Sequence, residues 1–579
     1  MPRLRVLIPL AILMLAALAA PAYAHAIVES TEPSIDSVVE TSPADVVMHF
    51  NEPIEVAFGA IRVYDTAGDR VDDGEVDYVE GDPTAVQVGL EPDLDTGTYT
   101  VTWRVISADA HVIQEAFVFH VGAPGTRPQG IADDVLGGQM GGDPLVGGLL
   151  GAMRILGYGS LIVLAGALVF MFFVWPQRAD TPGGDPPHAE FVRRWSRALV
   201  VAWIVAVFAT AASVILQGAH AAGLGLAESM QPALLRDVVT TRFGRVMTIR
   251  ALVLLAGGVL WAVAHKRSAD GSAAPSRGAL LGMATLVIAA YAATAFAGHA
   301  GSTDPVAVNV PVDVLHLAAA GAWIGGLAIL VFAAWPSFDL DAGHGSLRAL
   351  SAVVKRYSDV AVIAVIAIVA SGLWQSWVEV RAWRAFTGTT YGLTLITKLA
   401  VFIPLVALGG FNNRWAKPRI EKAAADDEPD HKPLQVLRRV VLVEVVLAML
   451  VIGVTAFLVN LAPARVAAGV TGPFITDVEF GEGSLNVLVD PNQIGENSVH
   501  LTATTESGAP MEIKEMRVQF TMPAESIGPI NGRGRKLAPG HFVVQGRQLS
   551  LPGRWTLEVI GRISRFDELR VRVPVTVNG

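Results

Sequence analysis

Eight apolar segments determine most of what this chain of 579 residues can fold into. Each is about 20 residues long, the length that an α-helix needs to cross the hydrocarbon core of a bilayer. In lipid, unpaired backbone polar groups are costly, so such segments cross as helices. The sequence therefore predicts a bundle of eight transmembrane helices, with the lipid bilayer as a partner. The segments lie near residues 148–175, 197–219, 247–265, 278–298, 312–335, 358–378, 392–411 and 439–461.

The composition agrees with a membrane protein and excludes several other classes. Charged residues make up 17% of the chain, whereas soluble domains usually contain about 25%. The sequence has no cysteine, which excludes disulfides, thiolate metal sites and cysteine nucleophiles. The formal net charge is −10, so no nucleic-acid partner is expected.

Residues 1–24 have the pattern of a secretory signal peptide. Two arginines precede the apolar run Val6–Ala20, and Ala22-Tyr23-Ala24 is typical of a cleavage site. A retained anchor helix is the alternative, but Pro21 and the small residues favour cleavage. Cleavage would make His25 the first residue of the mature chain.

Lysine and arginine in the loops predict the orientation of the bundle. The loops that begin after Trp175, His265, Trp335 and Phe411 contain 17 of these residues, and the loops on the other side contain five. Because positive loops stay in the cytoplasm, we expect a multi-pass plasma-membrane protein. Both flanking soluble regions then face the periplasm or the cell exterior.

The two flanking regions are predicted to be all-β. Short alternating strands separated by Pro, Gly and Asp turns are typical of a Greek-key β-sandwich. We expect one sandwich over residues 25–122, a Gly/Pro-rich linker over 123–147, the membrane domain over 148–461 and a second sandwich over 466–579. The fold class is thus a multi-domain membrane protein: sandwich, eight-helix bundle, sandwich.

His25, Asp109 and His111 are the first candidate metal ligands. A terminal histidine offers its amine and its imidazole Nδ1 to one ion, and nitrogen donors suit Cu(II). Asp109 and His111 are two positions apart in a loop between predicted strands, so in extended backbone they point to the same side. Residues 25–122 also contain 20 acidic residues against three arginines, and this negative field would concentrate cations.

Residues 25–122 resemble the periplasmic copper-binding protein CopC. The resemblance rests on His25-Ala26, Ser30-Thr31-Glu32-Pro33, Phe50-Asn51-Glu52-Pro53 and the segment Trp103–His111. It implies that Cu(II) binds to His25, Asp109 and His111. Ala110 stands where that family usually has glycine, and one methionine in the region gives no support for a methionine-rich Cu(I) site. His49 and His120 lie on predicted strands and are interpreted as structural.

Three histidines and an aspartate mark the outer half of the predicted bundle. His220 ends the second predicted helix, His299 ends the fourth, and His316 lies four residues into the fifth, on one helical face with Asp313. Polar groups at membrane depth are costly and usually mark a pathway or a site. Interfacial histidines bonded to backbone or lipid headgroups are the alternative. Lys398 and Glu444 are further intramembrane ionisable residues, with snorkelling as the simpler explanation for Lys398.

The membrane region resembles the CopD family of copper membrane proteins. The matching segments are Thr241-Arg242-Phe243-Gly244, Gly298-His299-Ala300, Asp313-Val314-Leu315-His316, Thr397-Lys398-Leu399 and Asn412-Asn413-Arg414. With the CopC-like region in front, the order matches CopC–CopD fusions linked to copper uptake. This resemblance implies that copper, as Cu(I) or Cu(II), passes inward with His220, His299, His316 and Asp313 as candidate ligands.

Residues 466–579 resemble a YtkA-like β-sandwich through Pro539-Gly540-His541-Phe542 and Leu551-Pro552-Gly553-Arg554-Trp555. Met516, Met522 and His541 could form a soft site for Cu(I). Methionines scattered on strands more often pack in a core, and this is the interpretation that we favour.

The leading hypothesis is a non-enzymatic protein of copper homeostasis that captures Cu(II) outside and imports copper. A periplasmic copper donor is a candidate partner. The alternatives are a redox protein with b-type haem between His299 and His316, and copper resistance or sensing without transport. A copper oxygenase ranks last, because Asp109 would occupy the position that oxygen needs. The sequence contains no P-loop, and the direction, the driving force, the oxidation state and the oligomeric state stay open at this point.

Overall fold

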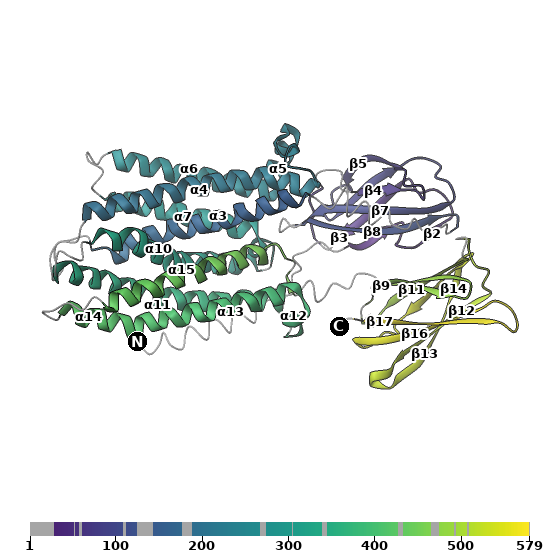
Figure 1. Ribbon diagram of the computed structural model, residues 1–579. Coiled ribbons are helices and arrows are strands. Elements are labelled where there is room, and N and C mark those ends of the chain that lie inside the picture. Colours follow the sequence, from purple (N-terminus) through teal and green to yellow (C-terminus); the bar gives the residue numbers. More distant parts are fainter. Residues whose placement is uncertain are drawn as a thin grey trace. The chain divides into compact units, whose positions relative to one another are not determined.

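The computed structural model resolves into two compact units, one with the long helices and one with both β regions. Figure 1 shows the course of the chain through them. The described residues are 28–50, 52–56, 61–107, 112–123, 143–176, 188–266, 274–303, 305–338, 344–381, 383–425, 432–461, 463–464, 474–490, 492, 494–505 and 509–577.

The N-terminal β region is a sandwich of two four-stranded sheets, with strand orders β1-β3-β6-β5 and β2-β8-β7-β4. Alternate residues of β3 point inward, so that Val46, Met48 and Phe50 are buried in the core. Short alternating strands of the kind expected from the sequence are present. The strands are β1 (Val28–Glu32), β2 (Val38–Val39), β3 (Asp45–Phe50), β4 (Ile61–Tyr64), β5 (Asp72–Tyr78), β6 (Ala85–Leu90), β7 (Gly97–Ile106) and β8 (Val112–Val121).

The C-terminal β region is also built from two sheets. The five-stranded sheet has the order β14-β15-β11-β10-β9, and the four-stranded sheet has the order β13-β12-β16-β17. The strands are β9 (Phe474–Phe480), β10 (Gly483–Asp490), β11 (Asn497–Thr505), β12 (Glu515–Met522), β13 (Ile527–Arg533), β14 (Arg535–Ala538), β15 (His541–Gly546), β16 (Gly553–Arg562) and β17 (Glu568–Val577).

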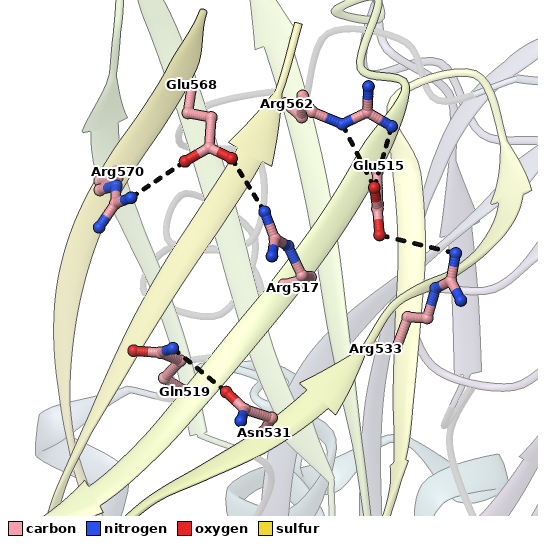
Figure 2. Close-up of polar contacts among 8 residues, drawn as sticks. All are labelled: Glu515, Arg517, Gln519, Asn531, Arg533, Arg562, Glu568 and Arg570. Atoms are coloured by element: carbon pink, nitrogen blue, oxygen red, sulfur yellow. Dashed lines mark hydrogen bonds and ion pairs between the residues drawn. The ribbon is translucent and has the colours of Figure 1, made fainter. Parts of the chain in front are cut away.

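The four-stranded sheet has one apolar face and one charged face. On β12, Met516, Val518 and Phe520 belong to the core, while Arg517 and Gln519 lie on the other face. Figure 2 shows that face, where Glu515 pairs with Arg562 at 2.9 Å and Glu568 pairs with Arg517 at 2.9 Å. This is the alternation expected of an antiparallel sheet with one solvated face.

The methionines of this region serve packing. Met516 and Met522 are both in the core cluster between the sheets. His541 alternates along β15 with Phe542 and is outside that cluster, although it is fully buried. The structure therefore does not bring Met516, Met522 and His541 together as a Cu(I) site.

The described part of the helical unit contains eight helices that are long and apolar enough to span a membrane, and each matches a predicted segment. They are Pro144–Val174 (α3 and η2), His188–Ala222 (α4), Arg242–Lys266 (α6), Arg277–Ala297 (α7), Val306–Ser337 (α9 to η6), Gly345–Val380 (within α11, His344–Val380), Thr390–Ala423 (α13, η8 and α14) and Lys432–Leu458 (α15).

Several of these spans consist of more than one helical element, and further elements connect the spans. They are η2 (Phe170–Val174), η3 (Glu228–Met230), α5 (Pro232–Thr240), α8 (His299–Ser302), α9 (Val306–Ala320), η4 (Gly321–Gly325), α10 (Gly326–Ile329), η5 (Leu330–Ala334), η6 (Trp335–Ser337), α12 (Trp383–Gly388), α13 (Thr390–Phe411), η8 (Asn412–Ala416) and α14 (Lys417–Ala425). Four of them, η2, η4, η5 and η8, are π-helical turns, a form that is frequent at functional sites.

The fifth span begins earlier than the sequence predicts. We expected it from residue 312, which places His316 four residues into the helix, but α9 begins at Val306. His316 is therefore ten residues, or about 15 Å along the axis, from the start of the helix. The expected position was wrong because Asn309, Pro311 and Asp313 lower the hydropathy of a turn that is nevertheless helical.

Candidate functional site

The predicted Cu(II) ligands His25, Asp109 and His111 lie outside the described residues. The strands from which they extend are described. Val28 at the start of β1 pairs with Phe50 at the end of β3, and Glu55 forms a bridge with Ile106 at the end of β7. The start of β1 and the β7–β8 connection therefore belong to the same end of the sandwich.

Apolar and backbone contacts fix this end of the sandwich. The rings of Phe50 and Trp103 meet edge to face, with centroids 5.4 Å apart. The Glu55 N–H donates to the Ile106 carbonyl at 2.8 Å, and Ile106 returns the bond at 3.2 Å. A rigid base of this kind holds attached ligands better than a loop alone.

Arg104 places a positive charge on β7, close to this end. Burial lowers the pKa of Arg104 to about 10, so the guanidinium stays charged at neutral pH. Its Nη1 donates to Gln114 Oε1 on β8 at 2.5 Å. In a strongly acidic region, this cation is a local exception to the negative field.

In the membrane unit, a row of three polar contacts connects α9 with α11. Trp374 Nε1 donates to Asn309 Oδ1 at 3.0 Å, Gln375 Nε2 donates to Asp313 Oδ1 at 2.9 Å, and His316 Nδ1 lies 2.9 Å from Ser371 Oγ. We call this row the α9–α11 seam. Asn309, Asp313 and His316 are four and three positions apart and so share one face of α9.

The hydrogen bonds of Ser371 favour one tautomer of His316. Ser371 Oγ donates to the Ala367 carbonyl at 2.6 Å, so the same oxygen is left to accept from His316 Nδ1–H. The lone pair of His316 is then on Nε2. Gly372, next to Ser371, leaves space beside the ring, because a Cβ at that position would lie 3.5 Å from His316 Cε1.

Further charged and polar groups surround Asp313. Lys398 of α13, His299 of α8 and Glu379 of α11 lie within electrostatic range of the Asp313 carboxylate. Lys398 also lies within electrostatic range of His316. Three of the four candidate membrane ligands therefore belong to one neighbourhood. Lys398 belongs to it too, which the snorkelling interpretation did not anticipate.

His220 lies on a different pair of helices. It is in the last turn of α4, and its ring faces Gly147 of α3, whose Cβ would lie 3.8 Å from the imidazole. None of the three hydrogen bonds of the seam involves α4. His220 is thus a candidate for a separate position rather than a member of the seam.

A second buried polar group includes Glu444 of α15. Its side chain is 2% exposed and hydrogen-bonds with Asn412 in the π turn η8. Tyr357 of α11 lies within electrostatic range of Glu444 and donates to the Trp323 carbonyl at 2.7 Å. Glu444 lies in the middle of α15.

Sequence reasoning missed four members of the seam: Asn309, Ser371, Trp374 and Gln375. Each is a single polar or aromatic residue within an apolar run, which hydropathy averages away. A search for polar residues three or four positions apart, such as Asn309, Asp313 and His316, would have marked the face of α9. No comparable spacing identifies which helix lies opposite.

Three family models match the chain. Residues 28–122 match the CopC domain, residues 145–308 match the copper resistance protein D-like N-terminal domain, and residues 351–458 match copper resistance protein D.

Curated relatives extend the similarity to nearly the whole chain. The chain is 26% identical over 575 residues to the copper transport protein CutJ of Bacillus subtilis (strain 168), and the match covers 97% of each protein. Copper resistance protein C of Pseudomonas syringae pv. tomato is 29% identical over 105 residues, which are 17% of this chain and 82% of that protein.

Among solved structures, CopC from Methylosinus trichosporium OB3b is 28% identical and has a TM-score of 0.15, with 17% of this chain and 95% of that chain covered. PcoC, a methionine-rich copper resistance protein from Escherichia coli, is 29% identical with a TM-score of 0.16, and 17% of this chain and 99% of that chain are covered.

Proposed function

Because this chain joins a CopC domain to the two parts of a copper resistance protein D membrane domain, we propose that it captures copper outside the cell and passes it inward. Copper is the cargo in this proposal. The CopC-like sandwich over residues 25–122 receives it, the eight-helix domain over 148–461 moves it, and the YtkA-like sandwich over 466–579 stays on the same outer side.

Capture is assigned to His25, Asp109 and His111. The strand ends that lead to these residues belong to one end of the sandwich, which supports a shared site. An amine, two imidazoles and a carboxylate form a nitrogen-rich donor set that suits Cu(II) above other divalent ions. The 20 acidic residues of this region against three arginines would raise the local concentration of the cation. A periplasmic donor protein is an alternative source of copper.

Acceptance in the membrane is assigned to the neighbourhood of the α9–α11 seam. His316 presents Nε2 as the ligand atom, and Asp313 and His299 lie within electrostatic reach of one another. Polar groups in a membrane span usually face a pathway, and imidazole is a suitable ligand for either oxidation state of copper. His220, at the end of α4, is an additional candidate closer to the capture side.

Inward movement needs no nucleotide. A cation that crosses toward the negative cytoplasm gains about 2.3 kcal/mol per elementary charge for each 100 mV of membrane potential. The buried group of Glu444, Asn412 and Tyr357 is a second polar position on a route from the seam to the cytoplasm.

The α9–α11 seam is the observation on which the transport proposal chiefly rests. We expect cells that express the wild-type chain at low external copper to accumulate more copper, measured by elemental mass spectrometry. His25→Ala and His316→Ala each abolish the increase, because one removes capture and the other removes the membrane ligand. His49→Ala, a histidine of β3 outside the proposed route, leaves the increase intact.

Other results would contradict the proposal in distinct ways. A fall in cellular copper on expression indicates export or resistance, and an unchanged level in cells with normal amounts of the protein indicates sensing or buffering. A Soret band in the purified protein that His299→Ala or His316→Ala removes indicates a haem protein.

A further inference from the structure

The five-stranded sheet of the C-terminal sandwich is buried on both faces. On β10, Leu485, Val487 and Val489 belong to the core between the sheets, yet Asn486 and Leu488 on the opposite face are only 5% and 0% exposed. The four-stranded sheet instead presents arginines and glutamates on its outer face (Figure 2). The outer face of the five-stranded sheet is therefore covered.

Two histidines lie side by side on this covered face. His500 and Thr502 are on β11, His541 is on β15, and the strand register pairs Thr502 with His541 and His500 with Val543. This diagonal arrangement places His500 Nδ1 3.1 Å from His541 Nε2. The imidazole centroids are 5.4 Å apart, and His541 is fully buried.

A carboxylate from the N-terminal sandwich completes the group. Asp36, between β1 and β2, adopts φ of 55° and is 1% exposed. Its Oδ2 accepts from Thr502 Oγ1 at 3.3 Å. Its Oδ1 lies 3.2 Å from Nε2 of His120, whose Nδ1 lies 2.9 Å from Thr98 Oγ1.

We propose that Asp36, His500 and His541 form a binding site for a divalent transition metal, with Cu(II) bound most tightly. One ligand atom from each residue lies within 4.8 Å of the other two. Two imidazole nitrogens that bind one ion at about 2.0 Å are about 2.8–3.3 Å apart for bond angles of 90° to 109°, and the observed 3.1 Å fits.

The chemistry of the group favours a cation over a simple hydrogen bond between the rings. Two imidazoles and one carboxylate suit Cu(II), Zn(II) and Ni(II), among which Cu(II) has the highest affinity. A buried carboxylate needs hydrogen bonds or a positive charge; Asp36 has hydrogen-bonding partners in Thr502 and His120, and a bound cation would add a positive charge. His120 and Thr98 hold Asp36 as outer partners usually hold a metal ligand.

This site is distinct from the proposed capture site, and it gives the C-terminal sandwich a role. Its ligands come from both β regions: Asp36 from the first, and His500 and His541 from the second. The hydrogen bond between Thr502 and Asp36 joins positions that are 466 residues apart. Metal binding would therefore fasten the two sandwiches to each other. The inference does not depend on transport through the membrane domain.

The test measures copper bound to the purified full-length chain in detergent. In a His25→Ala/His111→Ala background, which removes both imidazoles of the proposed capture site, the chelator-stripped protein is dialysed against Cu(II) alone. We expect adding His500→Gln to lower bound copper by one ion per chain and to remove an electron paramagnetic resonance signal with hyperfine coupling to two imidazoles. His120→Gln weakens Cu(II) binding about 10- to 100-fold, as outer partners of metal ligands generally do.

Matched variants separate a metal site from a structural one. His49→Gln changes a histidine of the same unit outside the group, and it leaves copper count and spectrum unchanged. Asp36→Asn keeps the shape of the carboxylate without its charge, so it tests the carboxylate ligand if His500→Gln does not fold. Circular dichroism verifies the fold of each variant.

Unchanged copper and an unchanged spectrum in folded His500→Gln and Asp36→Asn would overturn the proposal and leave a hydrogen-bonded interface. Because the comparison is made within one background, failure of the capture site does not alter its outcome. That failure would appear separately, as equal copper in the wild type and in the background.

Discussion

Asp72 shows how one buried carboxylate can organise a turn. Its side chain has no exposure and accepts from the backbone N–H of Val63 at 2.8 Å, from that of Gly74 at 3.0 Å and from Arg70 Nε at 2.9 Å. The contacts connect β4 to the start of β5. Both backbone donors would be left without this acceptor if the carboxylate were removed.

We expect Asp72→Ala to destabilise the N-terminal sandwich by about 1–3 kcal/mol, the usual cost of an unsatisfied buried donor. Hydrogen-exchange mass spectrometry of the full chain would then show faster exchange over residues 61–75. Asp69→Ala, on the exposed part of the same turn, serves as the control. Equal exchange in the two variants would contradict this role for Asp72.

The candidate residues differ in how far sequence could identify them. His299, Asp313 and His316 were identified because ionisable groups stand out in apolar runs, and the structure brings their neighbourhood together. Ser371 and Gln375 were not identified, since a single serine or glutamine in a membrane helix does not indicate a particular role. His500 was missed, because a histidine that alternates with Val499 and Leu501 on a strand gives no signal of a metal site by itself.

At the scale of elements, α3 and the π turn η4 approach each other closely at glycines. A Cβ on Gly325 would lie 2.0 Å from the Ile162 carbonyl oxygen, and a Cβ on Gly166 would lie 2.1 Å from the Gly325 carbonyl carbon. Gly321 and Gly325 are four positions apart, the spacing of small residues that lets membrane helices approach closely. These glycines are required by space rather than by backbone angle.

Gly325→Ala is expected to force α3 and η4 apart and to cost about 1–3 kcal/mol, as overpacking generally does. Thermal unfolding of the detergent-solubilised protein would show a lower midpoint. Gly453→Ala on α15 is the matched control, because nothing lies within 4 Å of its added Cβ. A midpoint unaffected by Gly325→Ala would show that the helices separate without cost.

Helix existence was easier to predict than helix limits. All eight predicted helices are present in the described part of the chain, because an apolar run of about 20 residues has few alternatives to a membrane helix. The start of α9 was wrong, since Asn309 is polar but has partners: its Nδ2 donates to the Thr303 carbonyl at 2.8 Å and its Oδ1 accepts from Trp374. Hydropathy counts such a residue as if it were unpaired.

At the scale of the whole molecule, the number of membrane-crossing helices decides whether the two β regions lie on the same side of the membrane. Eight is even, so if all eight helices cross, the residues before α3 and those after α15 emerge on one side. Because the loops on the opposite side contain most of the positive residues, we propose that this side is the exterior. By contrast, no sequence pattern could associate Asp36 with His500 and His541, because only the fold brings such distant positions together.

Single cysteines would test this orientation, since the chain has none of its own. A membrane-impermeant maleimide applied to intact cells is expected to label Asp77→Cys in the first sandwich and Arg565→Cys in the second. Lys266→Cys, in an inner loop, reacts only after permeabilisation. Labelling of one sandwich but not the other would mean that the number of crossing helices is odd.

The α9–α11 seam also restricts how the helical unit can move. Sliding one of these helices along the other by a single turn, about 5.4 Å, would break all three hydrogen bonds at once, in a medium with no water to replace them. The two helices are therefore expected to travel as one rigid body through any transport cycle. Relative movement would then occur between this pair and a neighbouring helix. Such a neighbour is α13, whose Lys398 interacts electrostatically with Asp313.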